Sequence, residues 1–177
     1  RRELYLTKDQ RRALLGAIEC PNLRAFIGAL CVLPLRPGAL AKLTAGDFDG
    51  RAGTLTVRHD KAGAGRRILL PESLADTLRQ QARGKLPKAP LFARPDGKPW
   101  DSQTWQKPFK EAAQAAGLPD DAVAYTLRHC ALTDLCVSGL DLMTVAALSG
   151  TSIAMLQKHY GHLQADRARD ALAGLVL

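Results

Sequence analysis

The sequence contains no long apolar segment. Its 177 residues include no window of about 20 consecutive apolar residues, the length that a transmembrane helix needs, so we expect no membrane-spanning helix and no membrane partner. A signal peptide is also absent, because the first residues, Arg1-Arg2-Glu3, lead into polar, helix-like sequence. An initiator methionine is missing too, and we therefore expect a fragment of a longer chain. Internal repeats, low-complexity segments and heptad arrays do not occur, which argues against repeat and coiled-coil architectures.

Paired cysteines and metal-ligand clusters are lacking as well. The four cysteines form no C-x-x-C pair, and each lies in an apolar segment. This pattern favours buried free thiols in a reducing cytosol over a disulfide framework or a zinc site. Asp, Glu and His residues are not grouped at metal-ligand spacing either. We therefore expect a cytoplasmic protein with no metal and no other cofactor.

Acidic residues are too few to balance the basic ones. The chain has 17 Asp and Glu against 25 Lys and Arg, a formal net charge of +8 and a pI of about 9.6. Such a balance favours polyanionic partners, either nucleic acid or anionic lipid, although a soluble protein can also be basic without one. With 177 residues, 46% of them hydrophobic, the chain has enough material for one domain with a real core.

Hydrophobic periodicity indicates a mostly α-helical fold. Thr7 and Gln10 have the spacing of a capping box at the start of a first helix. Pro34 and Pro37 end the second helix and predict a sharp turn around Arg36. The predicted helices span residues 7–19, 21–31, 37–43, 72–83, 102–116, 126–138, 141–148, 152–160 and 165–175.

A change of periodicity marks one small antiparallel β-sheet within this helical pattern. Residues alternate between apolar and polar at 54–58 and again at 67–70. The intervening segment is rich in turn-forming residues, so the two runs predict a β-hairpin. Residues 84–100, rich in Pro and Lys, predict a surface loop. The expected class is therefore α+β, mostly α with a small antiparallel sheet.

Residues suited to phosphodiester chemistry without a metal recur along the chain. A phosphate in such a reaction gains negative charge, and the forked guanidiniums of Arg36 and Arg128 suit its oxygens. Tyr160 offers an oxygen nucleophile, provided that a base or a cationic pocket activates it. Lys61, on the hairpin tip, could protonate a departing sugar hydroxyl as a general acid. The four residues together supply the two phosphate-binding cations, the nucleophile and the general acid.

The order of these segments resembles that of the tyrosine recombinases, the phage integrase family. The resemblance extends over nearly the whole chain, and its specificity comes from four motifs in the right order. They are Leu35-Arg36-Pro37-Gly38, the hairpin lysine, Tyr125-Thr126-Leu127-Arg128-His129, and Leu148-Ser149-Gly150-Thr151-Ser152 followed by Lys158-His159-Tyr160-Gly161-His162. The resemblance implies that Arg36 and Arg128 clamp the scissile phosphate, Lys61 protonates the leaving 5′ oxygen and Tyr160 forms a 3′-phosphotyrosine.

Three positions depart from the usual pattern of that family. Tyr125 stands where histidine is usual, and Thr151 stands where histidine or tryptophan is usual. Both hydroxyls could still donate a hydrogen bond to a phosphate, so both are candidate catalytic residues, but a phenol is a poor base near neutral pH. Ala39 replaces a common acidic residue. His129, next to the second arginine, is interpreted as a DNA-contacting or supporting group, as are Arg36, Lys61, Arg128 and Thr151.

The resemblance also implies a domain organisation and partners. Residues 1–177 would form the catalytic domain, and the N-terminal DNA-clamping domain of the family would be absent from this chain. The partner would be double-stranded DNA, bound by a homotetramer, whereas the isolated domain would be monomeric. The protein would be bacterial or phage-encoded and cytoplasmic. The tail helix, 165–175, would pack either on a neighbouring protomer or back on its own domain.

The sequence leaves two other functions open, and it leaves open whether Tyr125 lies in the core. Residues 141–160 resemble a helix-turn-helix, so a DNA-binding module without catalysis is one alternative. A type IB topoisomerase, which shares phosphotyrosine chemistry, is the other. Tyr125 could be a core residue, whereas the polar neighbours of Tyr160 predict an exposed placement for that side chain.

Overall fold

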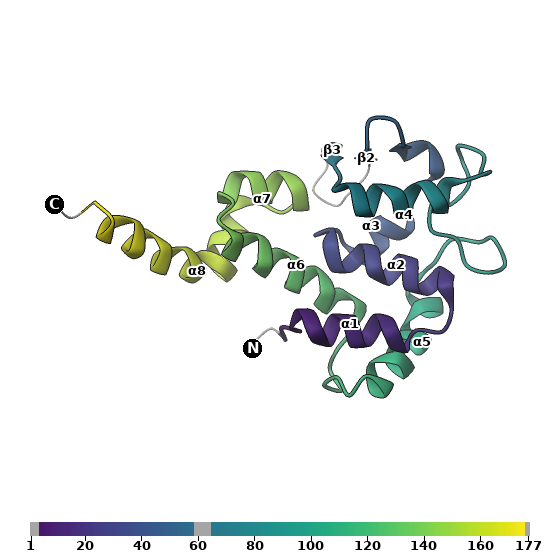
Figure 1. The fold of residues 1–177 in the computed structure, drawn as a ribbon, viewed down its shortest axis with the longest axis horizontal. Helices are drawn as coiled ribbons and strands as arrows, with labels where there is room; N and C mark the ends of the chain where they lie inside the picture. The colour runs from purple at the N-terminus through teal and green to yellow at the C-terminus, as the bar shows by residue number, and fades with distance from the viewer. Residues whose placement is uncertain (1–3, 59–64, 176–177) are drawn as a thin grey trace.

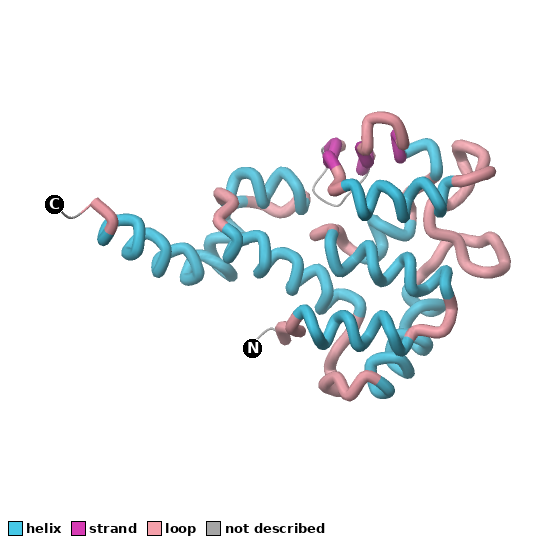
Figure 2. The backbone as a smooth tube through the Cα atoms, in the orientation of Figure 1, coloured by secondary structure: helices cyan, strands magenta, loops and turns pink. Residues whose placement is uncertain are grey.

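The protein is mostly helical and carries one small sheet, as a computed structural model shows. The structure describes residues 4–58 and 65–175, without the side chains of residues 164–167. Figures 1 and 2 show the helices packed as one body, from which the C-terminal helix extends. The helices are α1 (Lys8–Ala17), α2 (Pro21–Val32), α3 (Pro37–Ala41), α4 (Glu72–Ala82), α5 (Ser102–Ala115), α6 (Ala124–Ser138), α7 (Leu142–Ser149) and α8 (Ile153–Ala173).

Local signals at the helix ends agree with the expectations from sequence. Thr7 caps α1, and its side chain and that of Gln10 form the reciprocal bonds of a capping box. Asp141 accepts a hydrogen bond from the backbone of Thr144 and so caps α7. Gly139 ends α6 with a φ of 107°, a conformation that favours glycine. Because these signals involve neighbouring residues, the sequence alone identifies them.

The sheet has the order β1–β2–β3 and is antiparallel throughout. The predicted hairpin is confirmed as β2 (Thr54–Val57) and β3 (Arg66–Leu69), and a short 3-10 helix, Ala45–Asp47, precedes β1. Strand β1 (Phe48–Asp49) was not predicted, because two residues are too few to show an alternating pattern. Lys61 lies outside the described residues.

The main core surrounds α2. Phe26 is fully buried, and its ring stacks at 6.1 Å from that of Trp100 and lies 5.4 Å from that of Trp105. These aromatic rings join α2 to α5 and to the loop that precedes α5. Their burial fixes the middle of α2 against α5 and so helps to position the turn that follows α2.

A smaller apolar cluster joins the last three helices. Its buried members are Leu132, Cys136, Val145, Leu156 and Tyr160. The prediction that Tyr160 is exposed is wrong, since only 7% of the residue is accessible. Its neighbours in sequence are polar, but Leu156 and Tyr160 are four residues apart and share the face of α8 that packs on α6 and α7.

The C-terminal segment forms one helix, not the two that were predicted. Helix α8 runs from Ile153 to Ala173 and continues through Gly161. A glycine inside a helix costs only about 1 kcal/mol, which neighbouring turns can offset. The end of α8 extends away from the body (Figure 1), and Leu172 is 65% exposed. The side chain of Leu172 therefore does not pack on its own domain, as it would if the tail folded back.

The described part of the chain holds four free cysteines. Cys130 and Cys136 are buried as expected, whereas Cys20 and Cys31 are only partly buried. Burial raises the pKa of the Cys31 thiol to about 12, so this group is a poor nucleophile at neutral pH. None of the helices described is both long and apolar enough to cross a membrane.

The carboxylate of Asp47, just before β1, bonds to Arg58, which follows β2. Its carboxylate accepts hydrogen bonds from the backbone and hydroxyl of Thr44 and from Arg58 Nε at 2.6 Å. Burial alone would raise the pKa of Asp47, but these bonds outweigh it and the pKa is lowered. The charged carboxylate therefore stabilises the fold above its unfolded pKa of about 3.9, and this contribution is lost as the pH falls through the lower folded pKa.

We expect Asp47→Asn to reduce the free energy of unfolding at pH 6, and the difference from the unmodified protein to shrink below about pH 4. Urea unfolding between about pH 3 and pH 6 measures this difference. Asp9→Asn, which alters an exposed carboxylate on α1, is the matched control. An Asp47→Asn difference that is the same at both ends of this range would contradict the account.

Candidate active site

Arg128 lies at the centre of the candidate site. It is only 2% exposed, and its guanidinium bonds to residues of two separate segments. Nη1 donates hydrogen bonds to the carbonyl oxygens of Pro34 and Ser149, and Nη2 donates to Thr151 Oγ1 at 3.1 Å. One side chain from α6 therefore joins the turn before α3 to the turn between α7 and α8.

The sequence around each acceptor explains why its oxygen is available. Pro37 is the first residue of α3 and Arg36 its N-cap, so the carbonyl of Pro34 belongs to neither α2 nor α3. Ser149 is the last residue of α7, and its carbonyl has no later turn of that helix to bond. Gly150 follows with a φ of 64°, which turns the chain so that Thr151 comes next to Arg128.

A second arginine, which the sequence reasoning missed, docks the sheet on the same turn. Arg66 Nε donates to the carbonyl of Leu148 at 2.9 Å, and Nη2 donates to that of Ser149 at 3.2 Å. The carbonyl of Ser149 thus accepts from both Arg66 and Arg128. The base of the hairpin is held beside the site by this contact. An arginine in a short strand is common, so the sequence carries no local signal for this role.

Tyr160 and His129 form a second close polar contact of the site. Tyr160 Oη lies 2.7 Å from His129 Nδ1, and the two rings stack with centroids 5.5 Å apart. The DNA contact that the sequence predicts for His129 stays a prediction. Its Nδ1 faces the tyrosine hydroxyl in this structure. The pairing follows from the packing of α8 on α6, which brings residues 31 positions apart into contact.

A cavity of about 410 Å³ connects these groups. It is lined by five residues that the sequence had singled out: Tyr125, Arg128, His129, Thr151 and Tyr160. All five therefore face one hollow, although they come from α6, the α7–α8 turn and α8. This hollow is the candidate active site.

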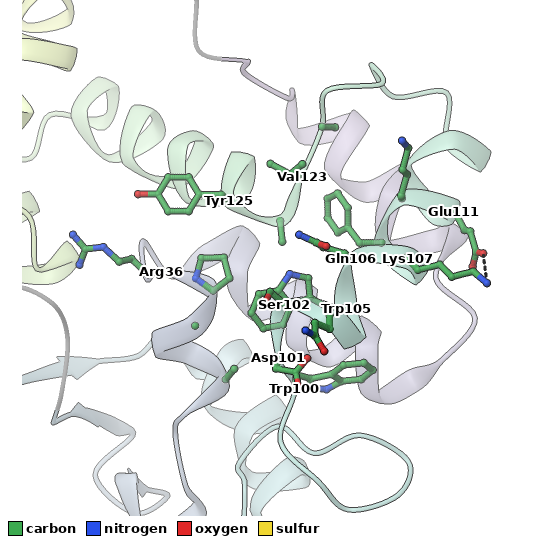
Figure 3. A pocket seen from close by; sticks show the side chains of 18 of the residues that line it. Arg36, Trp100, Asp101, Ser102, Trp105, Gln106, Lys107, Glu111, Val123 and Tyr125 are labelled. Carbon is green, nitrogen blue, oxygen red and sulfur yellow. Dashed lines mark ion pairs between the residues drawn. The ribbon is translucent and has the colours of Figure 1, made fainter.

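Arg36 lies on an adjoining and larger cavity of about 1400 Å³. Tyr125 lines both cavities and is 53% exposed, so the interpretation of Tyr125 as a core residue is wrong. Figure 3 shows Arg36 and Tyr125 extending toward the same side, from the starts of α3 and α6. Lys42, Lys107 and Lys110 add positive charge to this cavity, and Asp101, Glu111 and Asp120 add negative charge.

No group of three or more His, Cys, Asp or Glu side chains gathers as metal ligands would within residues 4–58 and 65–175. Arg128 supplies positive charge to the candidate site, and Arg36 supplies it to the adjoining cavity. Arg128 is held by neutral oxygen atoms in the contacts described above. A buried cation of this kind attracts an anion more strongly than one in water does.

Replacing Arg66 tests whether the hairpin is held through Leu148 and Ser149. Arg66→Met removes two charge-assisted hydrogen bonds, so we expect a loss of about 1–3 kcal/mol in stability and faster amide hydrogen exchange in the α7–α8 turn. Arg67→Met is the matched control, because Arg67 is exposed and donates to Thr54 Oγ1 on the same sheet. Equal exchange rates in the turn for both variants would show that Arg66 does not hold it.

Comparison with known proteins places these features in context. The model of the phage integrase family matches residues 5–167. An integrase/recombinase of Escherichia coli is 30% identical over 202 residues, covering 90% of this chain and 60% of that protein. Tyrosine recombinase XerA of Pyrococcus furiosus is 25% identical, covering 94% of this chain and 60% of that protein. The chain thus spans about 60% of the length of these curated relatives.

A solved structure shows the same fold. The Tn1549 transposon integrase in complex with transposon right end DNA superposes with a TM-score of 0.84 at 20% identity. The match covers 99% of this chain and 66% of that one. The predicted fold, mostly helical with a small antiparallel sheet and similar to recombinase catalytic domains, is confirmed.

Proposed function

Since this chain belongs to the phage integrase family of tyrosine recombinases, we propose that it is the catalytic part of a site-specific recombinase that cleaves and rejoins double-stranded DNA. The observation that supports this most directly is the shared cavity, in which the hydroxyl-bearing Tyr160 and the buried cation Arg128 face one hollow. A nucleophile and a fixed positive charge are what attack on a phosphodiester requires.

In the first step Tyr160 Oη attacks the scissile phosphorus. A bond forms between Oη and phosphorus, and the bond to the 5′ oxygen of the next nucleotide breaks. Arg36 and Arg128 bind the nonbridging oxygens and stabilise the negative charge that develops on them. The 5′ oxygen leaves with a proton from Lys61, a role that rests on the resemblance because Lys61 lies outside the described residues.

The second step reverses the first with a different DNA strand. A free 5′ hydroxyl attacks the phosphotyrosine, and Tyr160 departs from phosphorus. The number of phosphodiester bonds is unchanged, so the reaction needs no external energy source and no cofactor. A type IB topoisomerase would rejoin the original strand, and joining to a partner strand distinguishes the two activities.

Tyr125 and Thr151 would assist by binding the phosphate. The exposed phenol of Tyr125 lies between the two cavities, where it can donate a hydrogen bond to a phosphate held by Arg36. Thr151 Oγ1 accepts a hydrogen bond from Arg128, so the hydroxyl proton of Thr151 points away from Arg128. Neither residue replaces the base that the family usually has, so the proton of Tyr160 needs another acceptor.

The end of α8 supports the expected assembly on DNA. Leu172, at the end of α8, and Leu175, just beyond it, are 65% and 74% exposed, and two large exposed apolar side chains so close together suit burial against another protein surface. We infer that this helix packs on a neighbouring copy in a DNA-bound tetramer, and that the domain is monomeric without DNA. A cytoplasmic location, where DNA is accessible, follows from the same proposal.

Covalent trapping tests the proposed function. With a nicked suicide duplex, in which the cleaved strand diffuses away, we expect the protein to form a protein–DNA adduct that survives denaturing electrophoresis. A library of duplexes randomised around the nick serves as substrate, and sequencing of the trapped DNA identifies the preferred site. Low salt strengthens binding through phosphate contacts and is used throughout.

Tyr160→Phe removes only the nucleophilic oxygen and should abolish the adduct. Tyr5→Phe is the matched control, because Tyr5 donates a hydrogen bond to Asp134 away from the cavity. If the unmodified protein binds DNA but gives no adduct from any duplex, the function is instead that of a noncatalytic module, in which α7 and α8 act as a helix-turn-helix.

A further inference from the structure

The contact between His129 and Tyr160 has no role in the two proposed steps of the reaction. The distance of 2.7 Å between Nδ1 and Oη is that of a short, direct hydrogen bond. Both side chains belong to packed helices, and Tyr160 is part of an apolar cluster with Leu156 and Val145. The two groups are therefore held together by the fold, not by a chance approach of exposed side chains.

The register of α6 explains how one turn of helix supplies two functions. Arg128 and His129 are consecutive, so their side chains leave the helix about 100° apart. Arg128 points toward the turns that contain Pro34 and Ser149, whereas His129 points toward α8. A cation for the phosphate and a ring nitrogen for the tyrosine are thereby positioned on the same cavity.

The reaction requires a base at this place. A free phenol has a pKa of about 10, so it seldom ionises unaided near neutral pH. The residue at the position of the family's usual histidine is Tyr125, whose neutral phenol is a poor base. Asp121 and His159 also line the cavity, and the ring nitrogen that lies 2.7 Å from Tyr160 Oη is Nδ1 of His129.

We propose that His129 is a further catalytic residue, the general base that accepts the proton of Tyr160. The inference rests on the proposed function. In the tautomer with its proton on Nε2, the Nδ1 lone pair accepts the hydrogen bond from Tyr160. As Oη attacks phosphorus, the Oη–H bond breaks and the proton passes to Nδ1, which leaves an imidazolium. When the second strand displaces the tyrosine, Nδ1 returns this proton to Oη.

The decisive variant is His129→Asn. The Asn side-chain oxygen takes roughly the place of Nδ1 and can accept the hydrogen bond, but it cannot take the proton. If His129 is the base, His129→Asn and His129→Ala should both slow single-turnover formation of the adduct by about 10²–10⁴-fold. His162→Asn, the same change at an exposed position of α8, should react at the unmodified rate.

A second substrate distinguishes loss of the general base from loss of the general acid. The preferred duplex is synthesised with sulfur in place of the bridging 5′ oxygen, because a thiolate leaves without a proton. The defect of His129→Asn should persist on this substrate, since Tyr160 must still lose its proton. The defect of Lys61→Ala should disappear. Circular dichroism spectra and unfolding midpoints of the variants show whether each is folded.

The outcomes distinguish this inference from the proposed function. Adduct formation by the unmodified protein with equal rates for His129→Asn would overturn the assignment of His129 alone, as would recovery of His129→Asn on the sulfur substrate. Absence of any adduct with the unmodified protein would overturn the proposed function and the role of His129 with it. A persistent defect in His129→Asn on both substrates supports the assignment.

Discussion

The buried guanidinium of Arg128 is the constraint on which the arrangement of the site depends. Removing a cation from water is costly unless polar groups surround it. Here the carbonyls of Pro34 and Ser149 and the hydroxyl of Thr151 provide such groups. Pro34 and Thr151 belong to turns and Ser149 is the last residue of α7, so neither of the two carbonyls has a helical partner of its own. The need to solvate one cation thus fixes two turns relative to α6, and Arg66 fixes the sheet to one of them.

This arrangement brings the candidate catalytic residues close together. The turn that bonds Arg128 through Pro34 also positions Arg36 two residues later, at the start of α3. The α7–α8 turn leads directly into the helix that holds Tyr160. Residue His129, next to Arg128, meets that tyrosine. Arg128 and His129, consecutive residues of α6, contact segments that are distant in sequence. These segments therefore face adjoining cavities.

The features that the sequence predicted correctly depend on neighbouring residues or on the order of the motifs. Capping at Thr7 and Asp141 and the stop at Gly139 depend on a few neighbouring residues, so they were predictable. Burial of Tyr160 was not, because its polar neighbours conceal the face of α8 that packs on two other helices. The roles of Arg66 and His129 depend on contacts across 83 and 31 positions, which no local pattern encodes.

The most direct test of the account is a structure of the Tyr160→Phe variant bound to an uncleaved duplex of its preferred site. The account predicts that guanidinium nitrogens of both Arg36 and Arg128 lie within about 3 Å of nonbridging oxygens of the same phosphate. It also predicts that this phosphorus lies in front of the aromatic ring at position 160, next to His129. A duplex whose phosphates all lie beyond hydrogen-bonding distance of Arg128 would show that this arginine holds the fold but does not bind the phosphate.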